Sequence, residues 1–152
     1  MKTVIKPLFL CFLLCFCISG FAFAQEGQDN SIVGKWKTID DKTGEPKSMV
    51  NIYEKDGKYF GQIVDLFREA NEDQNPICDK CKDKDSRKDQ PIKGMVIIND
   101  LVQKGEKYGD GTILDPDDGK IYDCKLWVKD GKLMVRGYIA FFFRTQTWQS
   151  VE

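Results

Sequence analysis

The sequence contains no histidine, and this absence removes the usual base or ligand from several kinds of site. A nucleophilic serine or cysteine lacks its ordinary imidazole base. Attachment of a c-type haem needs histidine after the second cysteine of a Cys-x-x-Cys pair, where Lys82 stands. Neither a nucleophile elbow nor a phosphate-binding glycine loop occurs. The residues give no positive argument for an enzyme, and we predict no metal and no cofactor.

Two further features are missing after the first 24 residues: a cluster of basic residues and an apolar run of membrane length. The 23 Lys and Arg residues nearly balance the 24 Asp and Glu residues and are mixed with them, which argues against a nucleic-acid partner. Without a second apolar run, we expect no membrane span in the mature chain.

The first 24 residues have the pattern of a cleavable secretory signal peptide. Lys2 and Lys6 precede an unbroken apolar run over 8–16. Residues 22–24 are Ala-Phe-Ala, the small-x-small pattern of a cleavage site. We therefore expect an exported protein, periplasmic or secreted, with one domain over 25–152. A membrane anchor or a buried core helix is the alternative interpretation.

Three of the six cysteines lie in the signal segment, which leaves Cys78, Cys81 and Cys124. In an oxidising compartment, Cys78 and Cys81 are expected to form a disulfide that closes a small loop. Two alternatives stay open: a redox pair, which would need a helix start after a strand, and a zinc site completed by Cys124 and an acid. Cys124 alternates with Tyr122 and Leu126, so we predict that it packs inward as a small hydrophobe.

Turn signals at short intervals divide the mature chain into segments rich in Val, Ile, Tyr, Phe, Trp and Thr. Asp56-Gly57 and Asp130-Gly131 suit tight hairpins because glycine accepts positive φ. No long amphipathic helix intervenes, which argues against a parallel β–α–β arrangement. The sequence predicts eight strands, at 32–39, 48–54, 58–66, 95–102, 108–114, 120–129, 132–140 and 142–149.

Consecutive hairpins favour an antiparallel meander, and eight strands can close on themselves, which removes exposed edges. We predict an all-β fold, a single up-and-down barrel, with a two-sheet sandwich as second choice. The segment 68–90 breaks the rhythm, because it is crowded with charged and amide residues. A loop of this length in a compact domain is usually functional or mobile.

The first and last predicted strands each carry a tryptophan, and the last also carries a basic residue. The motif Gly34-Lys35-Trp36 opens the first strand, and Arg144 begins a motif that ends at Trp148. In a closed meander these strands are neighbours. We therefore expect the Arg144 guanidinium over the Trp36 indole, a structural latch worth about 1–2 kcal/mol when partly desolvated.

Together these motifs resemble the bacterial family known as domain of unknown function 2147. The resemblance implies a small exported protein with a lipocalin-like, or calycin-like, β-barrel and no assigned biochemical role. It also implies that Trp36 packs under Arg144 at the base of the barrel. Two positions depart from the family pattern: Phe143 stands where glycine is frequent, and Tyr108 stands where tryptophan is. The matching stretches run in one order through 34–36, 40–46, 57–61, Cys78 with Cys81, 91–94, 111–116, 119–120 with Tyr122, 135–138 and 144–148.

Our leading hypothesis is a non-enzymatic barrel that binds a small, partly apolar ligand among inward-facing aromatic residues. A one-residue error in register would invert the facing of every residue on a strand. The alternatives are a cell-envelope interaction module that uses the 68–90 loop, and an enzyme with carboxylate or thiol chemistry. The candidate wall residues are aromatic or hydrogen-bonding groups on the strands: Tyr59, Tyr122, Arg136, Tyr138, Gln146 and Trp148.

Overall fold

The computed structural model describes residues 30–151, and the predicted signal peptide over 1–24 lies outside them. All regular structure in this part of the chain is β, and no helix in it is long and apolar enough to cross a membrane. The predicted strand limits differ from the observed ones by one or two residues at most. The strands are β1 (Gly34–Ile39), β2 (Pro46–Lys55), β3 (Lys58–Leu66), β4 (Val96–Lys104), β5 (Lys107–Asp115), β6 (Lys120–Lys129), β7 (Lys132–Ile139) and β8 (Phe142–Ser150).

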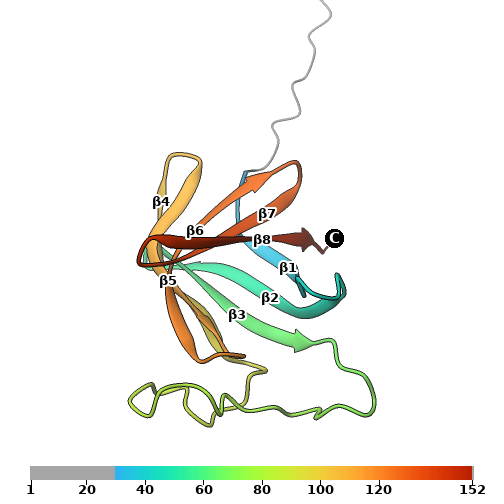
Figure 1. The fold of residues 1–152 in the computed structure, drawn as a ribbon. Coiled ribbons are helices and arrows are strands. Elements are labelled where there is room, and N and C mark those ends of the chain that lie inside the picture. The colour runs from blue at the N-terminus through green and yellow to red at the C-terminus, as the bar shows by residue number, and fades with distance from the viewer. Residues whose placement is uncertain (1–29, 152) are drawn as a thin grey trace, which may run out of the picture.

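The eight strands form one closed antiparallel barrel in sequence order (Figure 1). Closure depends on β1 and β8, where Trp36 pairs with Ser150 and Lys37 pairs with Gln149. The Val151 N–H extends this contact by donating to the Lys35 carbonyl at 3.0 Å. The prediction of an up-and-down barrel is confirmed.

Alternation along each strand gives the barrel an apolar interior. On β6, Cys124 and Leu126 are buried, whereas Asp123 and Lys125 are exposed. Cys124 is a free, buried cysteine. Burial raises the pKa of its thiol to about 12, because the thiolate would lose its hydration. Cys124 is therefore a packing residue, as predicted.

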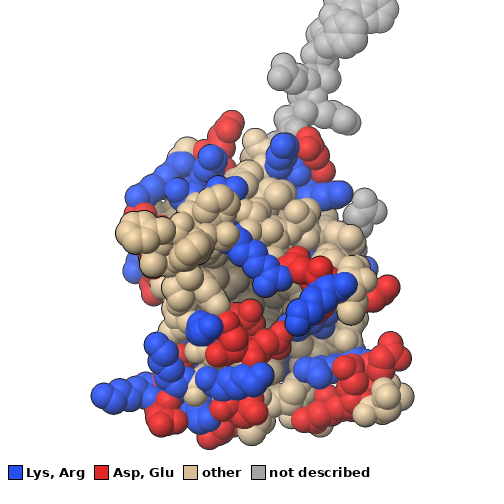
Figure 2. Space-filling view, viewed as in Figure 1, with Lys and Arg blue, Asp and Glu red and all other residues tan. Residues whose placement is uncertain are grey.

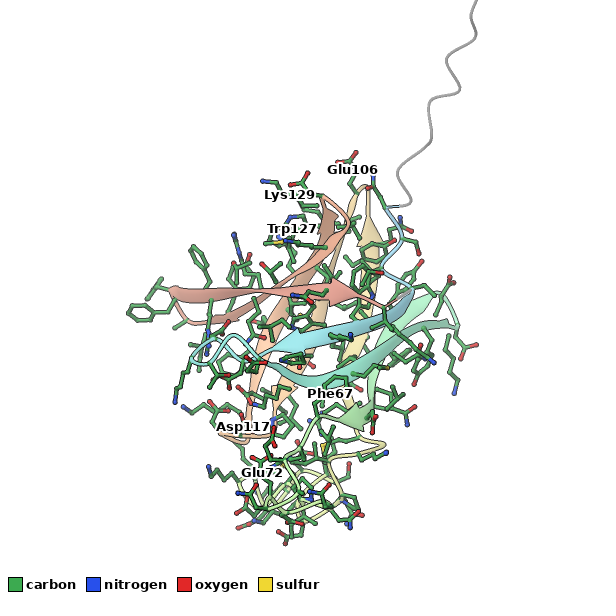
Figure 3. All side chains as sticks on the ribbon, turned by 90° about the vertical axis from the view of Figure 1, so that its right-hand side faces the viewer. Phe67, Glu72, Glu106, Asp117, Trp127 and Lys129 are labelled. Carbon is green, nitrogen blue, oxygen red and sulfur yellow. A yellow bond between two sulfur atoms is a disulfide. The ribbon has the colours of Figure 1, made fainter. Side chains whose placement is uncertain are left out.

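The two ends of the barrel are built differently. The closed end carries the tight β2–β3, β4–β5 and β6–β7 turns, and the open end carries the other four connections, over 40–45, 67–95, 116–119 and 140–141. Figure 3 marks the closed end with Glu106 and Lys129 and the open end with Asp117. The closed end is filled by side chains that are at most 1% exposed, namely Ile52, Leu101, Leu126 and Leu133.

The long β3–β4 loop lies under the open end of the barrel (Figure 1). The predicted disulfide between Cys78 and Cys81 is confirmed, and both residues are buried. The loop contacts the β5–β6 turn, where the Lys80 ammonium donates to the Asp117 carbonyl at 2.8 Å. Gly119 allows this approach, because a Cβ there would lie 1.8 Å from the Lys80 carbonyl oxygen. The loop is therefore docked against the barrel.

The expected latch between Trp36 and Arg144 is not formed, and strand direction explains why. Trp36 is the third residue of β1 and pairs with Ser150 at the end of β8, whereas Arg144 stands six residues earlier on β8. At about 3.3 Å per residue, this separates them by roughly 20 Å. The Trp36 indole instead donates to the Ile32 carbonyl at 2.8 Å, and Arg144 pairs with Asp41 at the open end.

One backbone contact between β4 and β5 makes a specific glycine necessary. A Cβ on Gly111 would lie 2.3 Å from the Asn99 carbonyl oxygen and 2.6 Å from the Leu101 nitrogen. We expect Gly111→Ala to lower the free energy of unfolding by roughly 2–4 kcal/mol, because backbone must move to relieve the overlap. Denaturant unfolding of the purified protein measures this loss.

Gly109→Ala is the matched control on the same strand. Its added Cβ would meet only the Lys125 side chain, at 3.6 Å, and a backbone oxygen at 4.0 Å. We expect a small effect at this position. Equal destabilisation by the two alanines would contradict the packing described for β4 and β5.

Candidate functional site

A cavity of about 560 Å³ occupies the open half of the barrel. Its deep wall is apolar and is formed by Ile63, Leu114, Val135 and Trp148, all at most 3% exposed. These residues face inward from β3, β5, β7 and β8, so four strands contribute to one surface. The cavity is therefore a property of the barrel and not of a single loop.

Fixed hydrogen-bonding groups interrupt the apolar wall at two places. The buried Thr38 and Ser48 hydroxyls lie 2.8 Å apart, and the Ser48 N–H donates to Thr38 Oγ1 at 3.0 Å. Gln146 accepts from the Trp148 indole N–H at 3.3 Å and donates to Asp41 Oδ2 at 3.0 Å. Each of these residues lines the cavity. Such groups can orient a bound molecule that is otherwise held by apolar contact.

Basic and acidic side chains form the mouth of the cavity. Figure 2 shows Lys, Arg, Asp and Glu interleaved over the lower part of the molecule, where Figure 1 places the open end and the β3–β4 loop. Arg144 pairs with Asp41, and Lys47 pairs with Asp117. A third base of the mouth, Arg68, lies 4.0 Å from a Glu72 carboxylate oxygen, and Lys42 is the fourth base that lines the cavity. Much of the charge at the mouth is thus neutralised within the protein.

Asp115 differs from Asp41, Asp117 and Asp118 at the mouth, because no basic side chain in residues 30–151 forms an ion pair with it. Its Oδ1 accepts the Asp117 N–H at 3.0 Å. Partial burial raises the pKa of this carboxyl, and the neighbouring Asp117 and Asp118 charges act in the same direction. Asp115 is therefore an acceptor that a ligand can use without breaking an ion pair.

Tyr122 and Asp118 form a second polar unit beside Asp115. The Tyr122 hydroxyl donates to Asp118 Oδ2 at 2.6 Å. This hydrogen bond, with burial and the Asp118 charge, raises the pKa of Tyr122 to about 12. The turn over 116–119 thus holds the phenol neutral and fixed in direction at the cavity wall.

The structure places only three of the six predicted wall residues, Tyr122, Gln146 and Trp148, on the cavity. Tyr59 packs edge-on against Tyr108 in the closed half, with ring centroids 4.7 Å apart. Arg136 and Tyr138 do not line the cavity either.

Arg136 and Tyr138 lie on the outer face of β7, because even-numbered positions there oppose the inward-facing Leu133 and Val135. Their partners are outside the barrel. The Arg136 guanidinium lies 4.5 Å from the centroid of the Phe143 ring, and the Tyr138 ring is 6.0 Å from the same ring.

Sequence reasoning missed the small residues that keep the cavity open. Thr38, Ser48 and Gly137 face inward at the open end, where larger residues would fill the space. The alternation of side chains on β1, β2 and β7 contains this signal, because each of the three small residues lies two positions from a buried apolar residue on the same strand. Asp115 ends β5 beside the turn over 116–119, and only the fold shows that this turn borders the mouth.

Within residues 30–151 no group of three or more Cys, Asp or Glu side chains is arranged to hold a metal ion. The acids at the mouth are instead directed to N–H groups, to the Tyr122 hydroxyl or to basic side chains.

Comparisons with known proteins give one family and one fold. A family model described as "Uncharacterized protein conserved in bacteria (DUF2147)" matches residues 34–150. A solved structure is similar with a TM-score of 0.68 and 17% identity, covering 80% of this chain and 84% of the other. It is described as "Protein HP1028 from the human pathogen Helicobacter pylori belongs to the lipocalin family". At this identity the likeness shows the fold alone. No curated protein matches significantly.

The Tyr122–Asp118 hydrogen bond predicts a measurable titration. Asp118→Asn removes the charged acceptor, so we expect the pKa of Tyr122 to fall from about 12 toward its ordinary value of 10.0. Carbon-13 NMR of labelled tyrosine, followed through alkaline pH, resolves this one phenol. Because the folded pKa is raised, the stabilisation from this phenol is complete below pH 10 and is lost as the pH rises toward 12.

Asp117→Asn is the matched control, because Asp117 pairs with Lys47 and does not contact the phenol. It should leave the Tyr122 titration unchanged. A Tyr122 pKa that stays the same in Asp118→Asn would show that the hydrogen bond does not hold the phenol.

Proposed function

The chain belongs to the bacterial DUF2147 family of uncharacterised proteins, and from its cavity we propose that it binds one small, partly apolar molecule. The observation that carries this proposal is the unfilled half of the barrel. An eight-stranded barrel can be packed solid or can hold one compact ligand. Here the space of about 560 Å³ falls within the usual range for small-molecule sites.

The distribution of polar groups supports one orientation of the ligand. Its apolar body would contact Ile63, Leu114 and Trp148 in the deep half, where water gains little hydrogen bonding. Its polar end would lie at the mouth, where Asp115 offers an acceptor that is not engaged by a basic side chain. A ligand with an N–H or O–H donor at one end fits this arrangement.

Export is part of the same proposal. The basic start, the apolar run and the Ala-Phe-Ala sequence at 22–24 support cleavage before residue 25. The disulfide between Cys78 and Cys81 fits an oxidising compartment. We therefore infer that ligand binding takes place in the periplasm or outside the cell.

A neutral fluorescent probe tests the binding function. N-phenyl-1-naphthylamine has an apolar body and one N–H donor, so we expect saturable binding with one probe per chain. Gly137→Leu should weaken this binding by about tenfold or more, because the new side chain would occupy the open half of the barrel. Probe fluorescence titration measures the affinity, and circular dichroism confirms that the variant is folded.

Thr147→Val is the matched control on β8. Thr147 is exposed, and its hydroxyl donates to the Met134 sulfur at 3.7 Å. The control should bind the probe as the wild type does. The proposal would be contradicted by unsaturable binding to the wild type, or by equal affinity in folded Gly137→Leu.

A further inference from the structure

The β7–β8 turn exposes three consecutive phenylalanines, which we call the phenylalanine tip. Phe141 is 98% exposed, Phe142 is 76% exposed and Phe143 is 61% exposed. Ile139, which ends β7, is 48% exposed. In Figure 2 uncharged atoms protrude on the left, where Figure 1 places this turn. Contiguous apolar exposure of this kind marks an interaction surface.

The phenylalanine tip is apolar on both sides of its hairpin. Phe142 and Phe143 are neighbours in β8, so their side chains point to opposite faces of the sheet. A flat protein partner would cover one of these faces and leave the other in water. A bilayer surrounds an inserted tip on all sides, so the shape favours a lipid surface.

The basic residues next to the phenylalanine tip also favour a lipid surface, specifically one that contains anionic phospholipids. The Arg136 guanidinium lies over the Phe143 ring, and its register partner on β6 is Lys125. Neither residue forms an ion pair in the described part of the chain. On the same outer face the Lys107 ammonium lies over the Trp127 ring, 5.6 Å from its centroid. Asp123 is the one acidic residue of β6 and β7.

The net charge of this outer face is positive, whereas the net charge of the whole chain is −1. A guanidinium with free N–H groups can bind phosphate oxygens. Aromatic residues flanked by Lys and Arg are also the usual composition at a membrane interface. Shape, composition and charge therefore agree on one partner.

We propose that the phenylalanine tip inserts into the surface of an anionic phospholipid bilayer, with Arg136 and Lys125 on the lipid phosphates. Ile139, Phe142 and Phe143 also line the mouth of the cavity. Docking by this tip places the mouth at the lipid surface. The proposal stands on the exposed tip and its cations, and it does not depend on what the cavity binds.

Co-sedimentation with lipid vesicles tests the proposal. We expect the protein to bind vesicles of phosphatidylglycerol and phosphatidylethanolamine and to bind vesicles of phosphatidylcholine alone more weakly. Phe141→Ser with Phe142→Ser should weaken binding to the anionic vesicles by about tenfold or more. Phe67→Ser is the matched control, because Phe67 is a 37% exposed phenylalanine in the β3–β4 loop, and it should bind as the wild type does.

Two further variants separate insertion from adsorption. Phe141→Trp should show stronger quenching by brominated lipid than the wild type, because the new indole enters the acyl region. Arg136→Gln should lose the preference for anionic vesicles. The proposal would be overturned if the wild type did not bind the anionic vesicles, or if a folded double-serine variant bound them equally well. It would also be overturned if the phenylalanine tip bound a protein partner and the wild type bound no vesicles.

Discussion

The hydrogen bonds between β1 and β8 decide what the other strands can do. They pair Trp36 with Ser150 and turn a meander with two open edges into a barrel with none. Closure also gives every strand an inner and an outer face, so that alternate side chains point into the barrel and out of it. Without it, Trp148 and Leu133 would be two apolar residues on a ribbon and would not belong to a common interior.

Side-chain volume then distinguishes the two halves of that interior. Large residues such as Leu101 and Leu126 fill the closed end, whereas Thr38, Ser48 and Gly137 leave space at the open end. The β3–β4 loop, fixed by its disulfide and by contact with Gly119, borders this space. The result is a half-packed barrel with an apolar depth and a charged mouth, the arrangement expected of a site for one compact ligand.

The sequence was sufficient to predict the strands and the barrel, because turn residues and alternation act locally. The disulfide between Cys78 and Cys81 was expected from their short spacing and an oxidising compartment. It was not sufficient for the site. Arg136 and Tyr138 have suitable chemistry but occupy the outer face of β7. The latch between Trp36 and Arg144 failed because adjacent strands that run antiparallel place their starts at opposite ends. Whether a barrel is filled or hollow depends on summed volumes across strands, which no single segment contains.

One half of this barrel is hollow and the other is packed. Methyl NMR of the protein, titrated with N-phenyl-1-naphthylamine, tests it most directly. We expect large chemical-shift changes for the methyl groups of Ile63, Leu114 and Val135 and small ones for those of Leu101, Leu126 and Leu133. Shifts of equal size in both sets, or shifts restricted to residues outside the barrel, would contradict it.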